Sequence, residues 1–198
     1  MSGAIVVELT PEPLERVDSQ IVVAGFFSDE RPLRGGAGRA DWRLCGGLSR
    51  RIVAGDLSGL RGEALLMGCG RALRAPRLLL LGLGERGGFE GPRVGDEIHA
   101  AVQRCLRLGC RRIGLSPLGV APDDVSRHAP ALAAGLGRLA RELGGEEGAV
   151  SRVQPIQVRL CVRARELPGV GRALLEASRS AGEDEVEIRI PSTDALAD

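Results

Sequence analysis

Residues 20–27 read QIVVAGFF, an apolar run that begins after the polar segment Asp18-Ser19 and ends at Ser28. A strand that is exposed on one face alternates apolar and polar residues, whereas an unbroken apolar strand is typical of a sheet covered on both faces. The run RLLLL at residues 77–81 has the same character. The two runs therefore predict buried strands in a sheet that lies between layers of helices.

Outside these two runs, the chain alternates between strand and helix patterns. Further strands are expected over residues 4–9, 63–67, 112–115, 156–162 and 186–190. Apolar residues at helical spacing predict helices over residues 42–55, 94–108, 125–143 and 167–177, with a loop over 28–39. This order predicts an α/β fold, a three-layer α/β/α sandwich with a mixed, largely parallel sheet.

The composition is that of one globular domain. The chain has 198 residues, of which 43% are hydrophobic and 27% are charged. We expect a single domain over residues 1–190 and a flexible tail over residues 191–198. All the basic residues are arginine, so reactions that need a lysine amine are excluded. The net charge of +1 gives no general attraction to nucleic acid, which we regard as an unlikely partner.

The cysteines and the apolar segments bear on the compartment. The five cysteines are odd in number, and no pair has the two-residue spacing of a metal or redox motif; they are Cys45, Cys69, Cys105, Cys110 and Cys161. The longest apolar run, residues 78–81, is far shorter than the roughly 20 residues of a membrane span. No signal peptide pattern opens the chain. We expect a reduced, cytoplasmic protein without a membrane partner.

Four strings resemble a known family. They are IVVAGFF at residues 21–27, SRRIVAGDLSGLRGEALLM at 49–67, RLLLLGLGERGGF at 77–89 and RRIGLSPLGVAPDD at 111–124. In this order they resemble the N-terminal domain of leucyl aminopeptidases, and the resemblance extends over about residues 4–190. That domain has the macro-domain fold, so the resemblance implies a macro-domain-like sandwich here.

The family's peptidase chemistry belongs to a second domain, where Asp, Glu and one Lys hold two zinc ions. The printed chain shows no such set, and the nearest tail string, STDA at residues 192–195, lacks the Glu, Gly and Arg that follow in the family. His99 and Cys105 lie six residues apart, on different faces of a predicted helix. We therefore expect no catalytic residues, no metal, no cofactor and no enzyme activity from this chain alone.

Macro domains also include modules that bind ADP-ribose, and glycine loops suit such a ligand because backbone amides can approach a phosphate closely. The candidate binding residues are Gly35, Gly36 and Gly38 in one loop, Ser116 and Gly119 in another, and Phe27 and Phe89 as stacking rings. The alternative is that the glycines serve only tight turns. The asparagines of the ligand-binding modules are replaced by residues 24–27, which counts against ADP-ribose hydrolysis.

Three functions follow from this interpretation. The first is a non-catalytic assembly or regulatory module with a protein partner or a second copy of itself. The second is a site for a nucleotide-derived small molecule of the ADP-ribose kind. The third is the non-catalytic half of a split zinc aminopeptidase, with the catalytic half on a separate chain.

Overall fold

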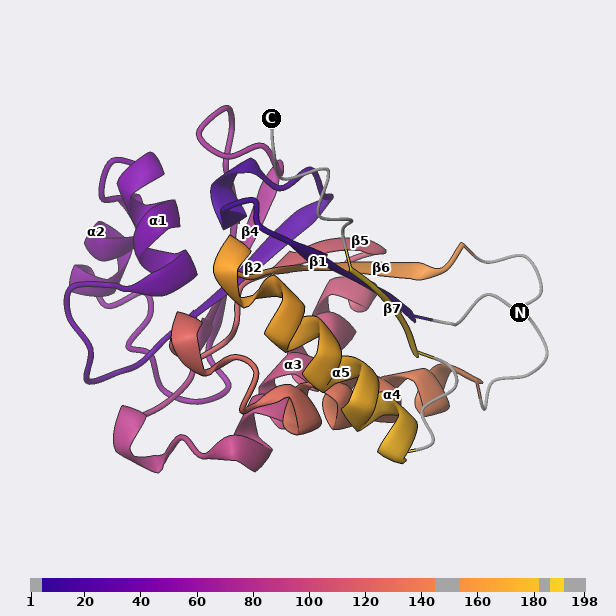
Figure 1. Ribbon diagram of the computed structural model, residues 1–198. Helices are drawn as coiled ribbons and strands as arrows, with labels where there is room; N and C mark the ends of the chain where they lie inside the picture. Colours follow the sequence, from indigo (N-terminus) through magenta and orange to yellow (C-terminus); the bar gives the residue numbers. More distant parts are fainter. Residues whose placement is uncertain (1–4, 145–153, 182–185, 191–198) are drawn as a thin grey trace.

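The sheet has seven strands in the order β3-β4-β2-β5-β6-β1-β7 (Figure 1). The computed structural model describes residues 5–144, 154–181 and 186–190. The strands are β1 (Ile5–Thr10), β2 (Ile21–Phe26), β3 (Ala64–Gly68), β4 (Arg77–Gly82), β5 (Arg112–Leu115), β6 (Ile156–Cys161) and β7 (Val186–Arg189). Neighbouring strands are parallel except for β3 and β4, which are antiparallel. The mixed, largely parallel sheet expected from the sequence is confirmed.

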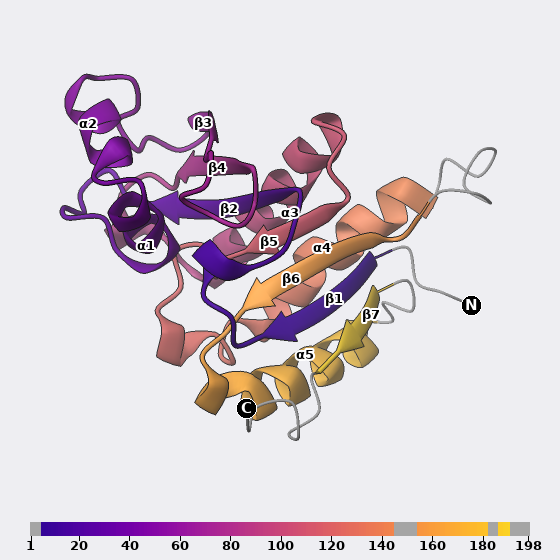
Figure 2. The same ribbon diagram turned by 90° about the horizontal axis from the view of Figure 1, so that it is seen from above.

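Helices cover both faces of this sheet, so the three-layer prediction is also confirmed. They are α1 (Gly35–Arg43), α2 (Gly47–Val53), α3 (Gly91–Arg107), α4 (Ala129–Gly144) and α5 (Leu167–Ala181). Helices α3, α4 and α5 pack on one face along its length, whereas α1 and α2 lie at the β3–β4 end of the molecule (Figure 2). The second helical layer is therefore confined to that end.

Strand β2 shows why the apolar run at residues 20–27 decides the fold. Ile21 and Val23 face the core under α3, α4 and α5. Val22 and Ala24 face the smaller core under α1 and α2. All four side chains are fully buried, and burying a Val or Ile side chain contributes roughly 1.5–3 kcal/mol. A polar residue at any of these positions would face one core or the other, so the strand tolerates none.

The single helix expected over residues 42–55 is wrong, because the chain forms two short helices there. Cys45 and Gly46 have left-handed backbone angles, with φ of 52° and 78°, and end α1. The Asp41 carboxylate then accepts hydrogen bonds from the Leu48 and Ser49 amides at 2.8 and 3.1 Å, which begins α2. The expected loop is also shorter than residues 28–39, since α1 begins at Gly35.

Helices α3 and α4 cross at very short range. A Cβ added at Gly135 would lie 2.3 Å from the Gly95 carbonyl oxygen, and one added at Gly95 would lie 2.5 Å from the Ala131 carbonyl oxygen. Only glycine lets two backbones approach this closely. The two glycines therefore fix how α4 is seated on α3.

Candidate functional site

A large hollow lies where the parallel strands β1, β2, β5 and β6 end. It is a cavity of about 780 Å³. Its walls come from four segments, residues 11–15 after β1, 33–42 around the start of α1, 116–125 after β5 and 161–163 at the end of β6. Ligands of open α/β sheets bind at this edge, outside the carboxyl ends of the strands. The cavity is therefore the candidate ligand site.

Four of the residues expected from the sequence line this cavity: Gly35, Gly36, Gly38 and Ser116. The missing side chains of two of these glycines leave room for protein atoms. A Cβ added at Gly36 would lie 2.6 Å from the Ser116 Cβ, and one added at Gly38 would lie 2.4 Å from the Leu33 carbonyl oxygen. The two candidate loops thus touch each other, which leaves no gap for a phosphate between Gly36 and Ser116.

The other three expected residues form a cluster of their own. Gly119 has φ of 69°, and a Cβ there would lie 2.5 Å from the Phe89 ring. The Phe27 and Phe89 rings meet edge to face with centroids 5.1 Å apart, and the Arg86 guanidinium lies 4.5 Å from the Phe27 centroid. Phe27 is only 2% exposed. In this arrangement Phe27 offers no free face to a base, contrary to the expected stacking role, and none of the three lines the cavity.

The arginines of the cavity wall are already matched to carboxylates. Arg34 lies 3.6 Å from Glu30, and Arg39 lies 3.5 Å from Glu15. Arg163 donates to Asp123 at 2.9 Å. A hydrogen bond from Arg165 also holds the pKa of Asp123 below its ordinary value. An anionic ligand would therefore compete with ion pairs for the arginines of this wall, although these pairs are exposed and individually weak.

Glu12 and Glu15, the partner of Arg39, line the same cavity as Cys161. Burial, together with the charges of Glu12 and Glu15, raises the pKa of the Cys161 thiol to about 12. The thiol is therefore protonated at neutral pH and is a poor nucleophile. Sequence reasoning missed these residues, although Glu12 and Cys161 could have been found from their position where two predicted parallel strands end.

The described residues contain no group of three or more His, Cys, Asp or Glu side chains placed to hold a metal ion. His99 lies 2.9 Å from Glu142, on the helical layer. Burial raises the pKa of Cys69 to about 11 and that of Cys105 to about 12.

In the part of the chain that the structure covers, no helix combines the length and the apolar character needed to cross a bilayer.

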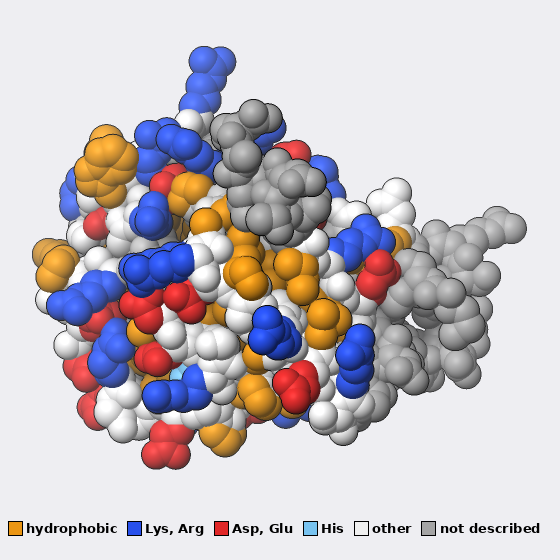
Figure 3. All heavy atoms as spheres, in the orientation of Figure 1, with side chains coloured by type: hydrophobic (Ala, Val, Ile, Leu, Met, Phe, Trp, Pro, Cys, Tyr) orange, Lys and Arg blue, Asp and Glu red, His pale blue; other side chains and the backbone are white. Residues whose placement is uncertain are grey.

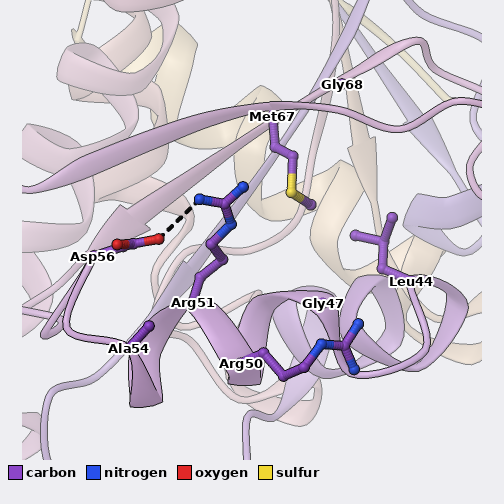
Figure 4. A pocket seen from close by; sticks show the side chains of 8 residues that line it. All are labelled: Leu44, Gly47, Arg50, Arg51, Ala54, Asp56, Met67 and Gly68. Carbon is purple, nitrogen blue, oxygen red and sulfur yellow. Dashed lines mark hydrogen bonds and ion pairs between the residues drawn. The ribbon is translucent and has the colours of Figure 1, made fainter.

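A second hollow, of about 520 Å³, lies between α2 and the edge strand β3 (Figure 4). Leu44 and Met67 extend toward each other across it. Arg50 and Arg51 project from α2, and Arg51 donates to Asp56 at 2.9 Å. Arginine side chains also gather over α1 and the connection between β3 and β4 (Figure 3). This end of the molecule therefore combines apolar and cationic surface.

Comparisons with known proteins bear on the family and the fold. The family model described as "Cytosol aminopeptidase family, N-terminal domain" matches residues 22–140. The chain is 30% identical over 110 residues to a probable cytosol aminopeptidase of Nitrosococcus oceani, covering 56% of this chain and 22% of that protein. The chain thus spans about a fifth of the length of the curated relatives it matches.

Solved structures show the same fold. A mutant of tomato leucine aminopeptidase superposes with a TM-score of 0.64 at 16% identity, covering 92% of this chain and 37% of that one. A Trypanosoma brucei macrodomain in complex with ADP superposes with a TM-score of 0.59 at 18% identity, covering 86% and 69%. The macro-domain-like fold implied by the resemblance is confirmed. The chain belongs to the cytosol aminopeptidase family, of which it carries the N-terminal domain.

Proposed function

We propose that this domain is a non-catalytic accessory module that acts through contacts with protein, in an assembly or as a regulatory part of one. The observation that carries the proposal is the distribution of exposed apolar side chains. Trp42 is 77% exposed and Val53 is 89% exposed, and Leu60 and Leu66 are exposed as well. All four come from residues 42–66, which run from the end of α1 through α2 and the next loop into β3. The other two exposed large apolar side chains of the described residues, Leu108 and Ile190, are less exposed and lie elsewhere in the sequence.

Exposed apolar side chains gathered on one end of a domain mark interaction surfaces. Tryptophan and arginine are the residue types that most often dominate binding at protein interfaces. Around Trp42 the surface offers Arg43 and Arg50, neither of which has a carboxylate partner among the described residues. This composition supports a protein partner or a second copy of the chain more than a small ligand.

The share of the aminopeptidase relatives that this chain matches bears on peptidase activity. The relatives are named as probable aminopeptidases, and this chain matches only about a fifth of their length. Two-metal hydrolysis needs several carboxylates around both ions, and the described residues bring no such group together. Peptide hydrolysis would therefore require a catalytic domain in addition to the residues seen here, on the same chain or on a separate one.

A crosslinking experiment tests the proposal. A photoreactive amino acid is placed at Val53 and, as the control, at Arg172, which is exposed on α5. Irradiation in cells is expected to give discrete protein adducts from position 53 and none from position 172. Equal labelling from both positions, or no adduct from position 53, would show that this end of the molecule makes no specific contact.

A second candidate function is the binding of a nucleotide-derived ligand in the 780 Å³ cavity. One observation favours it: α1 begins at the cavity wall, and its N-cap residue Arg34 makes no side-chain cap. Helix N-termini attract anions. The macrodomain solved with ADP has the same fold. Against it stand the contact between Gly36 and Ser116 and the pairing of the wall arginines, so this function ranks second.

A further inference from the structure

Strand β3 leaves one side of the sheet open. It is the last strand in the sheet order and pairs only with β4. The pairing is bracketed by the Gly82 amide, which donates to the Glu63 carbonyl, and the Cys69 amide, which donates to the Pro76 carbonyl. Backbone groups alternate in direction along an antiparallel strand, so Leu65 and Met67 face β4. The amides and carbonyls of Ala64, Leu66 and Gly68 therefore point away from the sheet.

This edge lacks the protection that edge strands usually carry. Natural proteins guard such edges with charged residues, proline, bulges or a covering element. The strand reads ALLMG, without a charge or a proline. Leu66 is 45% exposed, and Ala64 and Gly68 are exposed too. No strand of the described sheet pairs with the outer side of β3. The edge is thus free to take one more strand.

Cationic groups lie on both faces beside this edge. On one face, Arg50 and Arg51 line the hollow that Met67 and Gly68 also line (Figure 4). On the other, Arg104 of α3 donates to the Gly62 carbonyl at 2.9 Å, just before the strand begins. Neither Arg50 nor Arg104 has a carboxylate within ion-pair distance in the described part of the chain.

The carboxylates near the edge are already in use. Asp56 accepts from Arg51 at 2.9 Å. The Glu63 carboxylate accepts from the amides of Ser58, Gly59 and Leu60 at 2.9, 2.8 and 3.1 Å. Neutral amides do not cancel the charge of Glu63, so this carboxylate offsets one of the two unpaired arginines, Arg50 and Arg104. The surroundings of the open edge therefore keep a net positive charge and favour a partner that brings negative charge.

We propose that the outer edge of β3 binds an extended acidic segment of a partner protein, which adds to the sheet as an eighth strand. The inference deepens the proposed function and rests on it, because it names the kind of protein that this end of the molecule contacts. The backbone of the added strand pairs with Ala64, Leu66 and Gly68. Its carboxylates meet Arg50 and Arg104, and an apolar side chain enters the hollow between Leu44 and Met67.

Two other occupants fit less well. A second copy paired through its own β3 would bring two sets of unpaired arginines together, which is unfavourable. A nucleic acid would satisfy the arginines, but it has no peptide backbone to continue the hydrogen-bond ladder of β3. The acidic strand is the occupant that uses both the open edge and the charge.

The test uses the whole chain and two blocked heptapeptides, in one of which glutamate alternates with valine and in the other lysine with valine. Binding is followed by amide chemical shifts and by hydrogen exchange. We expect the glutamate peptide to shift and protect the amides of Ala64, Leu66 and Gly68, and the lysine peptide to do neither. The proposal is overturned if neither peptide binds, if binding leaves these amides unchanged, or if a thymidine oligonucleotide protects them better.

Variants separate charge from backbone pairing. The double variant Arg50→Glu/Arg104→Glu is expected to bind the glutamate peptide about tenfold more weakly, as two exposed ion pairs are lost. Its control, Arg172→Glu/Arg179→Glu on α5, changes the same charge elsewhere and should bind normally. Leu66→Pro removes an outward amide and leaves the amides that face β4, so it should abolish binding. Unchanged binding by the Arg50→Glu/Arg104→Glu variant overturns the role of charge.

The outcomes also distinguish this inference from the proposed function. Specific crosslinks from position 53 without any peptide binding at β3 would refute the added strand and leave the accessory module in place. The absence of crosslinks from position 53 together with peptide binding at β3 would refute the surface around Val53 as the contact site.

Discussion

Gly38→Ala tests whether the glycines of the cavity wall serve packing within the protein. The added methyl group would lie 2.4 Å from the Leu33 carbonyl oxygen and 3.0 Å from its carbonyl carbon. Both are backbone atoms, so no side chain can rotate out of the way. Overpacking of this kind costs about 1–3 kcal/mol, and alanine returns about 0.5–1 kcal/mol through its helix propensity. We therefore expect the free energy of unfolding to fall by up to about 2.5 kcal/mol, with a mid-range value of about 1 kcal/mol.

Gly169→Ala is the matched control, because Gly169 also lies in a helix and a Cβ there would meet nothing within 4 Å. This variant should be stabilised by about 0.5–1 kcal/mol. Urea denaturation measures both changes, and thermal denaturation should show Gly38→Ala melting up to about 10 °C below the parent chain. If Gly38→Ala were as stable as Gly169→Ala, the glycine would not be required for packing, and the reasoning would be refuted.

Three further predictions concern the core, the thiols and an ion pair. Gly135→Ala should destabilise the chain by at least about 1–3 kcal/mol in urea, because its methyl group would meet the Gly95 carbonyl oxygen at 2.3 Å. Iodoacetamide at mildly alkaline pH should label the exposed Cys45 fast and Cys161 slowly. The free energy of unfolding should fall as the pH rises from about 9 toward 12, because burial raises the pKa of Cys161 in the folded chain to about 12. On acidification, the free energy of unfolding of Asp123→Asn should fall less than that of the parent chain. In the parent chain the hydrogen bond from Arg165 lowers the pKa of Asp123, and the stability gained from the ionised carboxylate disappears as the pH falls through that pKa.

The order of elements could be predicted because burial leaves a plain record in the sequence. The unbroken run of residues 20–27 places β2 between two helical layers, and the strand at residues 112–115 is found with the expected bounds. The break between α1 and α2 could not be predicted in the same way. Gly46 is a sequence signal for a helix end, but the break also depends on the left-handed backbone of Cys45, a non-glycine residue, and on the Asp41 carboxylate that begins the next helix.

The candidate site could be predicted only in part. Gly35, Gly36, Gly38 and Ser116 do meet at one cavity, as their positions after predicted strands suggest. What the glycines accommodate depends on the distance from Gly36 to Ser116, residues far apart in the sequence, so local pattern carries no signal for it. The pairing of Arg39 with Glu15 and of Arg163 with Asp123 is likewise long-range. Whether any nucleotide binds there remains a prediction.

The central proposal is that this domain works through protein contacts rather than by binding a nucleotide in its cavity. The most direct measurement is the melting temperature of the unmodified chain with and without saturating ADP-ribose. A ligand that binds the folded state at a hundred times its Kd stabilises it by about 2.7 kcal/mol, a shift of several degrees. The account predicts no shift. A rise of several degrees would contradict it.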